Sequence, residues 1–214
     1  MILLLCAVVL LSYPLNADTA LGQLMDKLQN KYDSMETLRA GFTQSYHSKR
    51  FSEKITESGV VYLRKGGFMK WQYLKPEKKV FVSDGNYFYY YVVEDKQVIQ
   101  ARVAQNADQR SPALFLAGSG NFIQDFRAEW ADPRPGSHLL KLTPLRPQSD
   151  FKYLIVDVDP VSGLILRMEV VDAYDNRTEY IFQQIQENPE IPSDFFTFRP
   201  PPGTDVIYQQ GETD

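Results

Sequence analysis

The sequence is poor in the residues that carry catalytic and metal chemistry. Its 214 residues include one cysteine, Cys6, and two histidines, His47 and His138. One cysteine excludes an intramolecular disulfide, and two isolated histidines match no zinc-ligand spacing. The chain also lacks a Gly-x-Ser-x-Gly elbow, a phosphate-binding loop and a dinucleotide fingerprint. We therefore expect a protein that is not an enzyme, with no catalytic residue, no cofactor and no metal.

A strong charge of either sign is absent as well. The chain has 23 Lys and Arg against 27 Asp and Glu, which gives a formal net charge of -4. A nucleic-acid-binding protein usually carries a basic footprint, so this composition argues against a nucleic-acid partner. The length suits one domain, and a hydrophobic content of 43% is enough for a real core.

The sequence has only one long apolar run, at residues 2–12. At about 11 residues it is too short to span a bilayer comfortably and is typical of a signal-peptide core. Cleavage after Ala17 would also remove Cys6, and a chain without disulfides must be held by its core alone. We expect residues 1–17 to be a cleaved signal peptide and 18–214 to be one domain in the periplasm. A buried N-terminal helix is the alternative for this run.

The pattern that follows predicts one helix and then a long antiparallel sheet. Apolar residues recur at helical spacing over 19–35, which predicts an amphipathic helix. From residue 38 to residue 46 the apolar period becomes two, as in a strand, and turn signals separate the later runs. The later predicted strands are 55–64, 68–74, 78–83, 86–93, 96–103, 127–131, 138–144, 152–159, 164–172 and 177–186, with a last short strand at 204–209.

Two short helices are predicted to interrupt the strands within residues 111–126. Ser111 and Pro112 form a good start for the first, and Asn121 can cap the second. No strand-helix-strand alternation is present, so the predicted fold is mainly β, of the α+β class. We expect an unclosed antiparallel barrel of about 10–11 strands, with two to three helices covering one face.

Large aromatic side chains are abundant, with 13 Tyr, 13 Phe and 2 Trp. Met69, Trp71 and Tyr73 share one face of a predicted strand, and the segment 87–91 is aromatic on both faces. One face must pack on a buried layer, and the other needs cross-strand partners or a ligand. From residue types alone, an ordinary sheet core with exposed tyrosines is favoured over a ligand surface.

Four short motifs follow one another in a characteristic order. The longest, residues 68–91, reads as an aromatic-x-Trp-x-Tyr strand, a proline, another strand, Ser-Asp-Gly and an aromatic strand. The others are Phe42-Thr43-Gln44, SPALFL at 111–116 and FTFRPPPG at 196–203. Together they extend over nearly all of the chain after the apolar run, and they resemble the LolA-type periplasmic carriers of outer-membrane lipoproteins.

This resemblance implies an unclosed antiparallel barrel with a helical lid over an apolar cavity. The cavity of such a carrier shelters the acyl chains of a lipoprotein, because each buried CH₂ gains about 0.8 kcal/mol over water. The implied partners are triacylated lipoproteins, an inner-membrane lipoprotein-releasing ABC transporter and an outer-membrane lipoprotein acceptor. The resemblance also implies a monomer that acts as a periplasmic chaperone.

The resemblance also suggests candidate site residues. We assign the lid to helix 19–35 and the helices of 112–126, with their apolar stripes facing the Trp71 side of the sheet. The predicted acyl-chain cavity is lined by Leu24, Leu28, Met69, Trp71, Tyr73, Phe88, Tyr90, Leu114 and Phe115. The family often has an arginine, thought to hold the lid shut, at the place that Lys65 occupies here. Arg64 is adjacent, so both are candidates for the lid gate.

Three alternatives stay open. The first is a LolA-like periplasmic lipid- or glycolipid-binding protein or envelope-stress sensor with the same fold. The second is the lipoprotein-anchored acceptor, which is disfavoured because Leu5, not a small residue, precedes Cys6. The third is a periplasmic hydrolase, for which only His47 and His138 could supply the chemistry near the cavity mouth.

Overall fold

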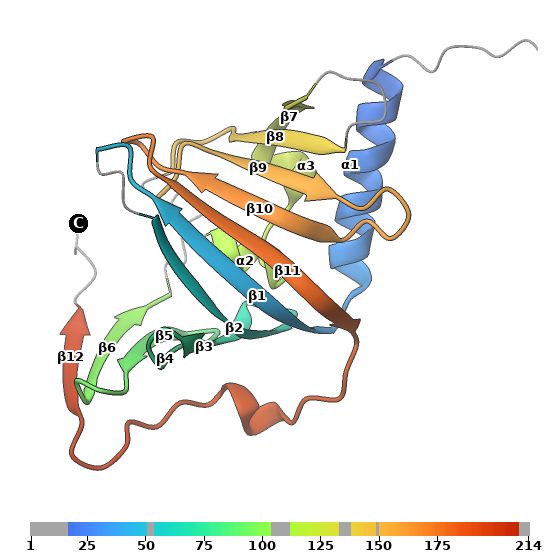
Figure 1. Ribbon diagram of the computed structural model, residues 1–214. Coiled ribbons are helices and arrows are strands. Elements are labelled where there is room, and N and C mark those ends of the chain that lie inside the picture. The colour runs from blue at the N-terminus through green and yellow to red at the C-terminus, as the bar shows by residue number, and fades with distance from the viewer. Residues whose placement is uncertain (1–16, 51–53, 104–111, 133–137, 149, 210–214) are drawn as a thin grey trace, which may run out of the picture.

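In the computed structural model, one twelve-stranded sheet curls around three helices (Figure 1). The structure describes residues 17–50, 54–103, 112–132, 138–148 and 150–209. The strand order is β12-β6-β5-β4-β3-β2-β1-β11-β10-β9-β8-β7, so β12 and β7 are the two edges of an unclosed half-barrel. The predicted mainly β fold is therefore confirmed.

The bounds of the elements agree closely with the sequence periods. The three helices are α1 (Ala17–Ser34), α2 (Pro112–Leu116) and α3 (Phe122–Asp125), and a 3₁₀ turn, η2, spans Ser193–Phe196. The strands are β1 (Thr37–His47), β2 (Lys54–Arg64), β3 (Phe68–Lys75), β4 (Lys79–Asp84), β5 (Tyr87–Val92), β6 (Gln97–Arg102), β7 (Phe126–Trp130), β8 (Leu139–Pro144), β9 (Tyr153–Val158), β10 (Ile165–Val171), β11 (Arg177–Glu187) and β12 (Asp205–Gln209).

Three details differ from the sequence predictions. The sheet has twelve strands where ten or eleven were expected, and the long helix runs from Ala17 to Ser34, not from 19 to 35. One pair, β12 with β6, is parallel, with Val206 opposite Val98. After β11 the chain runs to the far edge of the sheet and enters β12 from the end at which β6 begins (Figure 1), so the two strands run in the same direction. The predicted signal peptide, apart from Ala17, lies outside the described residues.

The concave face of the sheet carries the main core. Val61 pairs with Trp71 and Leu63 with Met69 across β2 and β3, and all four side chains are buried against the helices. Helix α1 adds the stripe that its period predicted, and α2 and α3 add aromatic and leucine side chains. The helical members of this core are Leu24, Met25, Leu28, Tyr32, Leu114, Phe115, Leu116 and Phe122.

The C-terminal tail covers part of the convex face (Figure 1). Phe195 packs edge-on against Tyr62 at 4.7 Å between ring centroids, and Phe198 lies 5.2 Å from Tyr89. Phe196 is 1% exposed, and Val82 on this face is equally buried. The second aromatic face of β5 is thus covered by the chain's own tail, where the sequence left a choice between cross-strand partners and a ligand.

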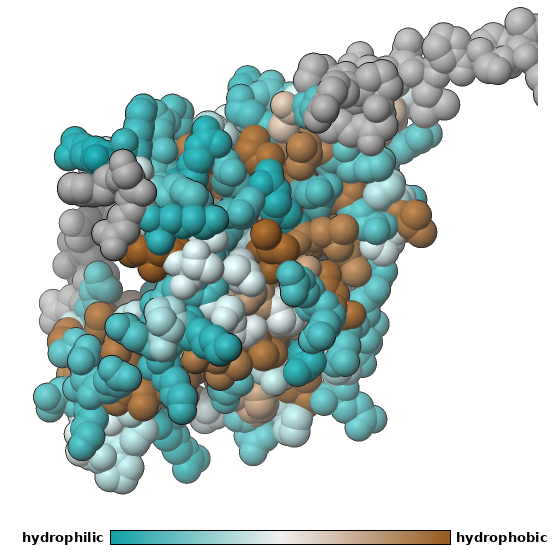
Figure 2. Space-filling model, viewed as in Figure 1, coloured by the Kyte–Doolittle hydropathy of each residue, from teal (hydrophilic) through white to brown (hydrophobic). Residues whose placement is uncertain are grey.

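The rest of the convex face is polar. Arg167 pairs with Glu179 at 2.5 Å and Arg177 with Glu169 at 2.7 Å, across β10 and β11. Figure 2, viewed from this side, shows hydrophilic residues over most of the surface with separate hydrophobic groups between them. No helix in the described part of the chain combines the length and apolar composition needed to cross a bilayer.

Candidate functional site

A cavity of about 110 Å³ lies between the concave face and α2. Strands β3, β10 and β11 form one side of it, and the start of α2 forms the other. Its lining residues are Trp71, Pro112, Ala113, Met168, Val170, Thr178 and Tyr180. The lining residues are mainly apolar, and three of them, Trp71, Thr178 and Tyr180, carry an N–H or hydroxyl donor, which suits an apolar ligand with a small polar group.

Trp71 stands at the centre of an aromatic layer on the concave face. Its ring meets Phe42 edge-on at 5.0 Å and Tyr180 edge-on at 5.5 Å, and Phe42 also meets Tyr73 at 5.0 Å. Each such pair adds about 0.5–1.5 kcal/mol beyond the burial of area. Gly59 permits this layer, because a Cβ there would lie 1.9 Å from the carbonyl oxygen of Gln72.

The predicted cavity residues fall into two groups. Trp71 lines the cavity itself. The others surround it: Leu24, Leu28, Met69, Leu114 and Phe115 belong to the continuous buried core, Tyr73 and Phe88 pack against that core, and Tyr90 is half-buried opposite Phe81 on β4. The structure therefore places the predicted residues on the concave face of the sheet and on the helices that cover it, but brings only Trp71 to the wall of this cavity.

Sequence reasoning missed the side of the cavity formed by β10 and β11. Met168 and Val170 on β10 lie opposite Tyr180 and Thr178 on β11. The apolar alternation along each strand is visible in the sequence, and it indicates that these four residues share one face of the β10–β11 hairpin. That this hairpin reaches Trp71 depends on the pairing of β11 with β1, and the sequence gives no local signal for that long-range contact.

A polar network on the concave face was also missed. The Tyr73 hydroxyl donates to Gln44 Oε1 at 2.8 Å, and Gln44 Nε2 donates to Glu57 Oε2 at 3.2 Å. Lys79 forms an ion pair with the other oxygen of Glu57. Burial raises the pKa of Tyr73 far above its ordinary value, so the hydroxyl stays protonated. Burial by itself lowers the pKa of Lys79, but the hydrogen bond to Glu57 and the interactions with Tyr90 and the Glu57 charge together outweigh it, so the pKa is raised.

The two candidate gate residues point to opposite faces. Lys65 Nζ donates to the carbonyl oxygen of Asp33 at 2.7 Å, in the last turn of α1, where a cation is favoured by the helix dipole. The Arg64 guanidinium instead donates to the carbonyls of Ile191 and Pro192 in the tail. Lys65 therefore holds a lid helix, and Arg64 holds the covering of the convex face.

Two buried hydrogen bonds also fix helix α1. The Tyr32 hydroxyl accepts a hydrogen bond from the Ile165 N–H at 3.3 Å, which ties the helix to β10. Gln29 Oε1 accepts from the Phe122 N–H at 2.7 Å, which ties it to α3. The start of α3 is capped by Asn121, as predicted, through bonds from the N–H groups of the next turn. The lid helices thus form one connected layer.

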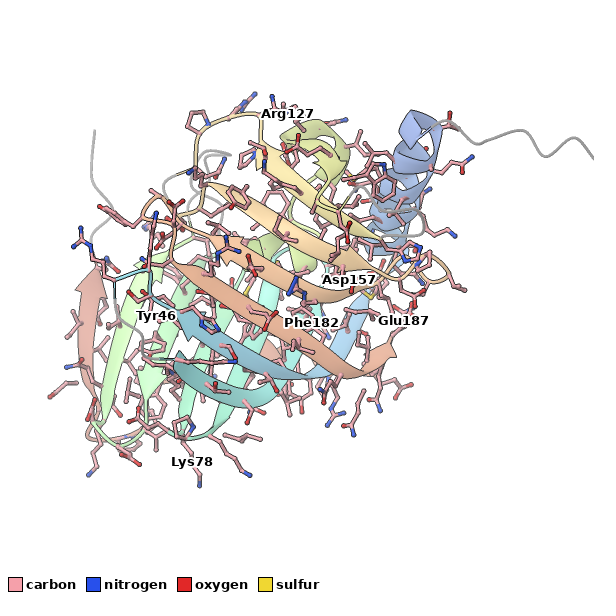
Figure 3. All side chains as sticks on the ribbon, turned by 45° about the horizontal axis from the view of Figure 1, so that its top comes forward. Tyr46, Lys78, Arg127, Asp157, Phe182 and Glu187 are labelled. Atoms are coloured by element: carbon pink, nitrogen blue, oxygen red, sulfur yellow. The ribbon has the colours of Figure 1, made fainter. Side chains whose placement is uncertain are left out.

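The two histidines lie far from each other. His47 ends β1, whereas the His138 carbonyl accepts from the Val158 N–H at the end of β9. Figure 3 labels Tyr46, which precedes His47, toward the left of the view, and Asp157, which precedes the Val158 that bonds to His138, toward the right. The structure does not bring these imidazoles together, so they cannot form the shared site that the hydrolase alternative requires.

Comparisons with known proteins agree with this architecture. Residues 33–199 match the family model described as outer membrane lipoprotein carrier protein LolA. The chain is similar to the outer-membrane lipoprotein carrier protein of Nitrosomonas europaea, with 28% identity over 95% of this chain and 96% of that protein. The corresponding protein of Cupriavidus pinatubonensis is 30% identical, over 89% of this chain and 90% of its own length.

One solved structure supports the fold alone. An uncharacterized conserved protein from Thermus thermophilus superposes with a TM-score of 0.54 at 13% identity. The superposition covers 88% of this chain and 98% of that one. At this identity it says that the two chains share a half-barrel architecture and nothing about a shared ligand.

Proposed function

The chain belongs to the LolA family of outer membrane lipoprotein carrier proteins, and from this membership we propose that it carries lipoproteins across the periplasm. The observation that supports the proposal most directly is the aromatic cavity between α2 and the concave face. Its lining has no charged side chain, so it can shelter hydrocarbon from water. The role is that of a chaperone, and binding and release are its only chemistry.

The energy of burial sets what the carrier must do. An acyl chain with about 15 buried methylenes gains about 12 kcal/mol relative to water, at about 0.8 kcal/mol for each. At about 30 Å³ for each water molecule, the cavity of about 110 Å³ has room for about four waters. That is far less than the space that about 15 methylenes need. Loading therefore requires the helical layer to move away from the sheet, so that the core opens into a larger cavity.

One contact of the lid is weak. Lys65 also pairs with Glu36 at 3.7 Å, and the two side chains are 45% and 72% exposed. The tether from Lys65 to the end of α1 therefore contributes about 1 kcal/mol or less. The bonds from Tyr32 and Gln29 are buried and fix the lid more firmly. We assign Lys65 as the outer latch of the lid and Arg64 as an anchor of the tail.

The partners follow from the family membership as proposals. We propose that residues 1–17 direct the chain to the periplasm and are then removed. There the protein, as a monomer, receives triacylated lipoproteins from an inner-membrane ABC transporter and delivers them to an outer-membrane acceptor. A lipid- or glycolipid-binding role with the same fold is the alternative that the binding experiment below separates from this one.

Loading of a purified triacylated lipoprotein onto cavity variants tests the proposal. Ala113→Phe fills the cavity from α2, and Trp71→Glu places a charge in it, so each should reduce loading at least about tenfold. Tyr174→Glu is the matched control. Tyr174 is 76% exposed in the turn between β10 and β11, so this variant should load lipoprotein normally. Normal loading of both cavity variants, in folded protein, would contradict the proposal. Loading of free glycolipid but not of lipoprotein would support the alternative.

A further inference from the structure

One buried polar group in the cavity wall has no partner. The indole N–H of Trp71 is buried, and no group in the described residues accepts a hydrogen bond from it. The side chain is 3% exposed and lines the cavity. Buried donors in folded proteins are nearly always bonded, so an unmet donor at a ligand cavity suggests that the ligand supplies the acceptor.

The other polar groups of the lining are hydroxyls. Tyr180 and Thr178 reach the cavity beside Trp71, and none of the seven lining residues is charged. Burial raises the pKa of Tyr180 to about 12, so its hydroxyl keeps its proton at neutral pH. A neutral acceptor oxygen fits this set, and an anion does not, because the lining offers no counter-charge.

The neighbouring polar network does not provide such a site. Tyr73, Gln44, Glu57 and Lys79 already bond to one another. A ligand would have to break these bonds to engage them. The donor of Trp71 has no hydrogen bond to give up among the described residues, which makes it the better recognition group.

We propose that Trp71 Nε1–H donates a hydrogen bond to the carbonyl oxygen of an acyl group of the bound lipid. The hydrocarbon next to that carbonyl packs against Met168 and Val170. The inference rests on the proposed carrier function and adds a specificity: the cavity distinguishes acyl lipids from alkyl lipids. The carbonyl belongs to an ester or to an amide, which share this chemistry.

Three single-chain probes test the proposal by calorimetry or by fluorescence displacement. They are 1-monopalmitoylglycerol, its amide analogue N-(2,3-dihydroxypropyl)palmitamide, and 1-O-hexadecylglycerol, an ether without a carbonyl. The wild-type protein should bind the ester or the amide about five- to tenfold more tightly than the ether. In Trp71→Phe this preference should disappear, because the ring stays and the donor is lost. Any loss of packing affects all three probes and cancels in the ratio of their affinities.

Trp130 provides the matched control. The chain has two tryptophans, so its proton–nitrogen NMR spectrum contains two indole signals, and Trp130→Phe assigns them. The Trp71 signal should move downfield with the carbonyl probe but not with the ether. Trp130→Phe should keep the affinity preference. This readout reports the hydrogen bond directly, whether or not the Trp71→Phe variant packs well.

The outcomes separate the two levels of the argument. Equal affinities for the ester, the amide and the ether, with the same Trp71 signal in all complexes, would overturn the carbonyl site and leave the carrier function intact. Failure of all three probes and of lipoprotein to bind would overturn both. Preference for the ester alone or the amide alone would support the site and assign the carbonyl to that linkage.

Discussion

Replacing Gln29 by methionine should loosen the joint between α1 and α3. The Gln29 side chain is 6% exposed, and its Oε1 accepts the bond from the Phe122 N–H. Methionine has a similar length and helix propensity but offers no such acceptor, so the buried N–H of Phe122 is left unpaired. That loss costs about 1–3 kcal/mol, and the bond from Gln29 to Asp33 adds about 0.5 kcal/mol.

The expected destabilisation is therefore about 2 kcal/mol, which lowers Tm by roughly 4–8 °C for a chain of this length. Urea unfolding measures the energy, and hydrogen exchange of the Phe122 amide reports the local opening. Gln23→Met is the matched control, since Gln23 lies exposed on the same helix, and it should change stability by less than about 0.5 kcal/mol. If both variants behave alike, the joint does not hold the lid.

The remaining predictions concern the latch, the tail and the tyrosine of the cavity. Lys65→Met should raise the off-rate of a bound fluorescent monoacylglycerol about two- to fivefold in stopped flow; an unchanged rate would contradict the latch role of Lys65. Phe196→Ala should lose about 3–5 kcal/mol in urea unfolding, yet bind the same monoacylglycerol normally while folded; weakened binding would show that the tail contributes to the cavity. Because folding raises the pKa of Tyr180 from about 10 to about 12, its stabilisation is complete below pH 10 and is lost as the pH rises to 12. Tyr180→Phe should therefore lose less stability than wild type between pH 10 and 12, and parallel curves would refute this reasoning.

The sequence predicted what depends on local periodicity. Alternation placed Met69, Trp71 and Tyr73 on one face of β3, and helical spacing placed Leu24 and Leu28 on the inner side of α1, as the structure has them. These predictions succeed because the side-chain direction along a single element follows from its backbone geometry.

Predictions that depend on long-range neighbours were incomplete. The alternation along β11 shows that Tyr180 and Phe182 share a face, but only the pairing of β11 with β1 brings that face to Trp71. The same limit applies to the tail, whose phenylalanines cover the convex face from a distant part of the sequence. The opposite roles of Arg64 and Lys65 depend on where the strand ends, which periodicity defines poorly.

The central claim is that this chain carries acylated protein, and native mass spectrometry of the protein purified from its own periplasm tests it most directly. The account predicts a complex whose additional mass is that of a triacylated polypeptide. That mass should be absent when Ala113→Phe is purified in the same way. A wild-type protein that carries only a lipid without a polypeptide, or no acylated cargo at all, would contradict the claim.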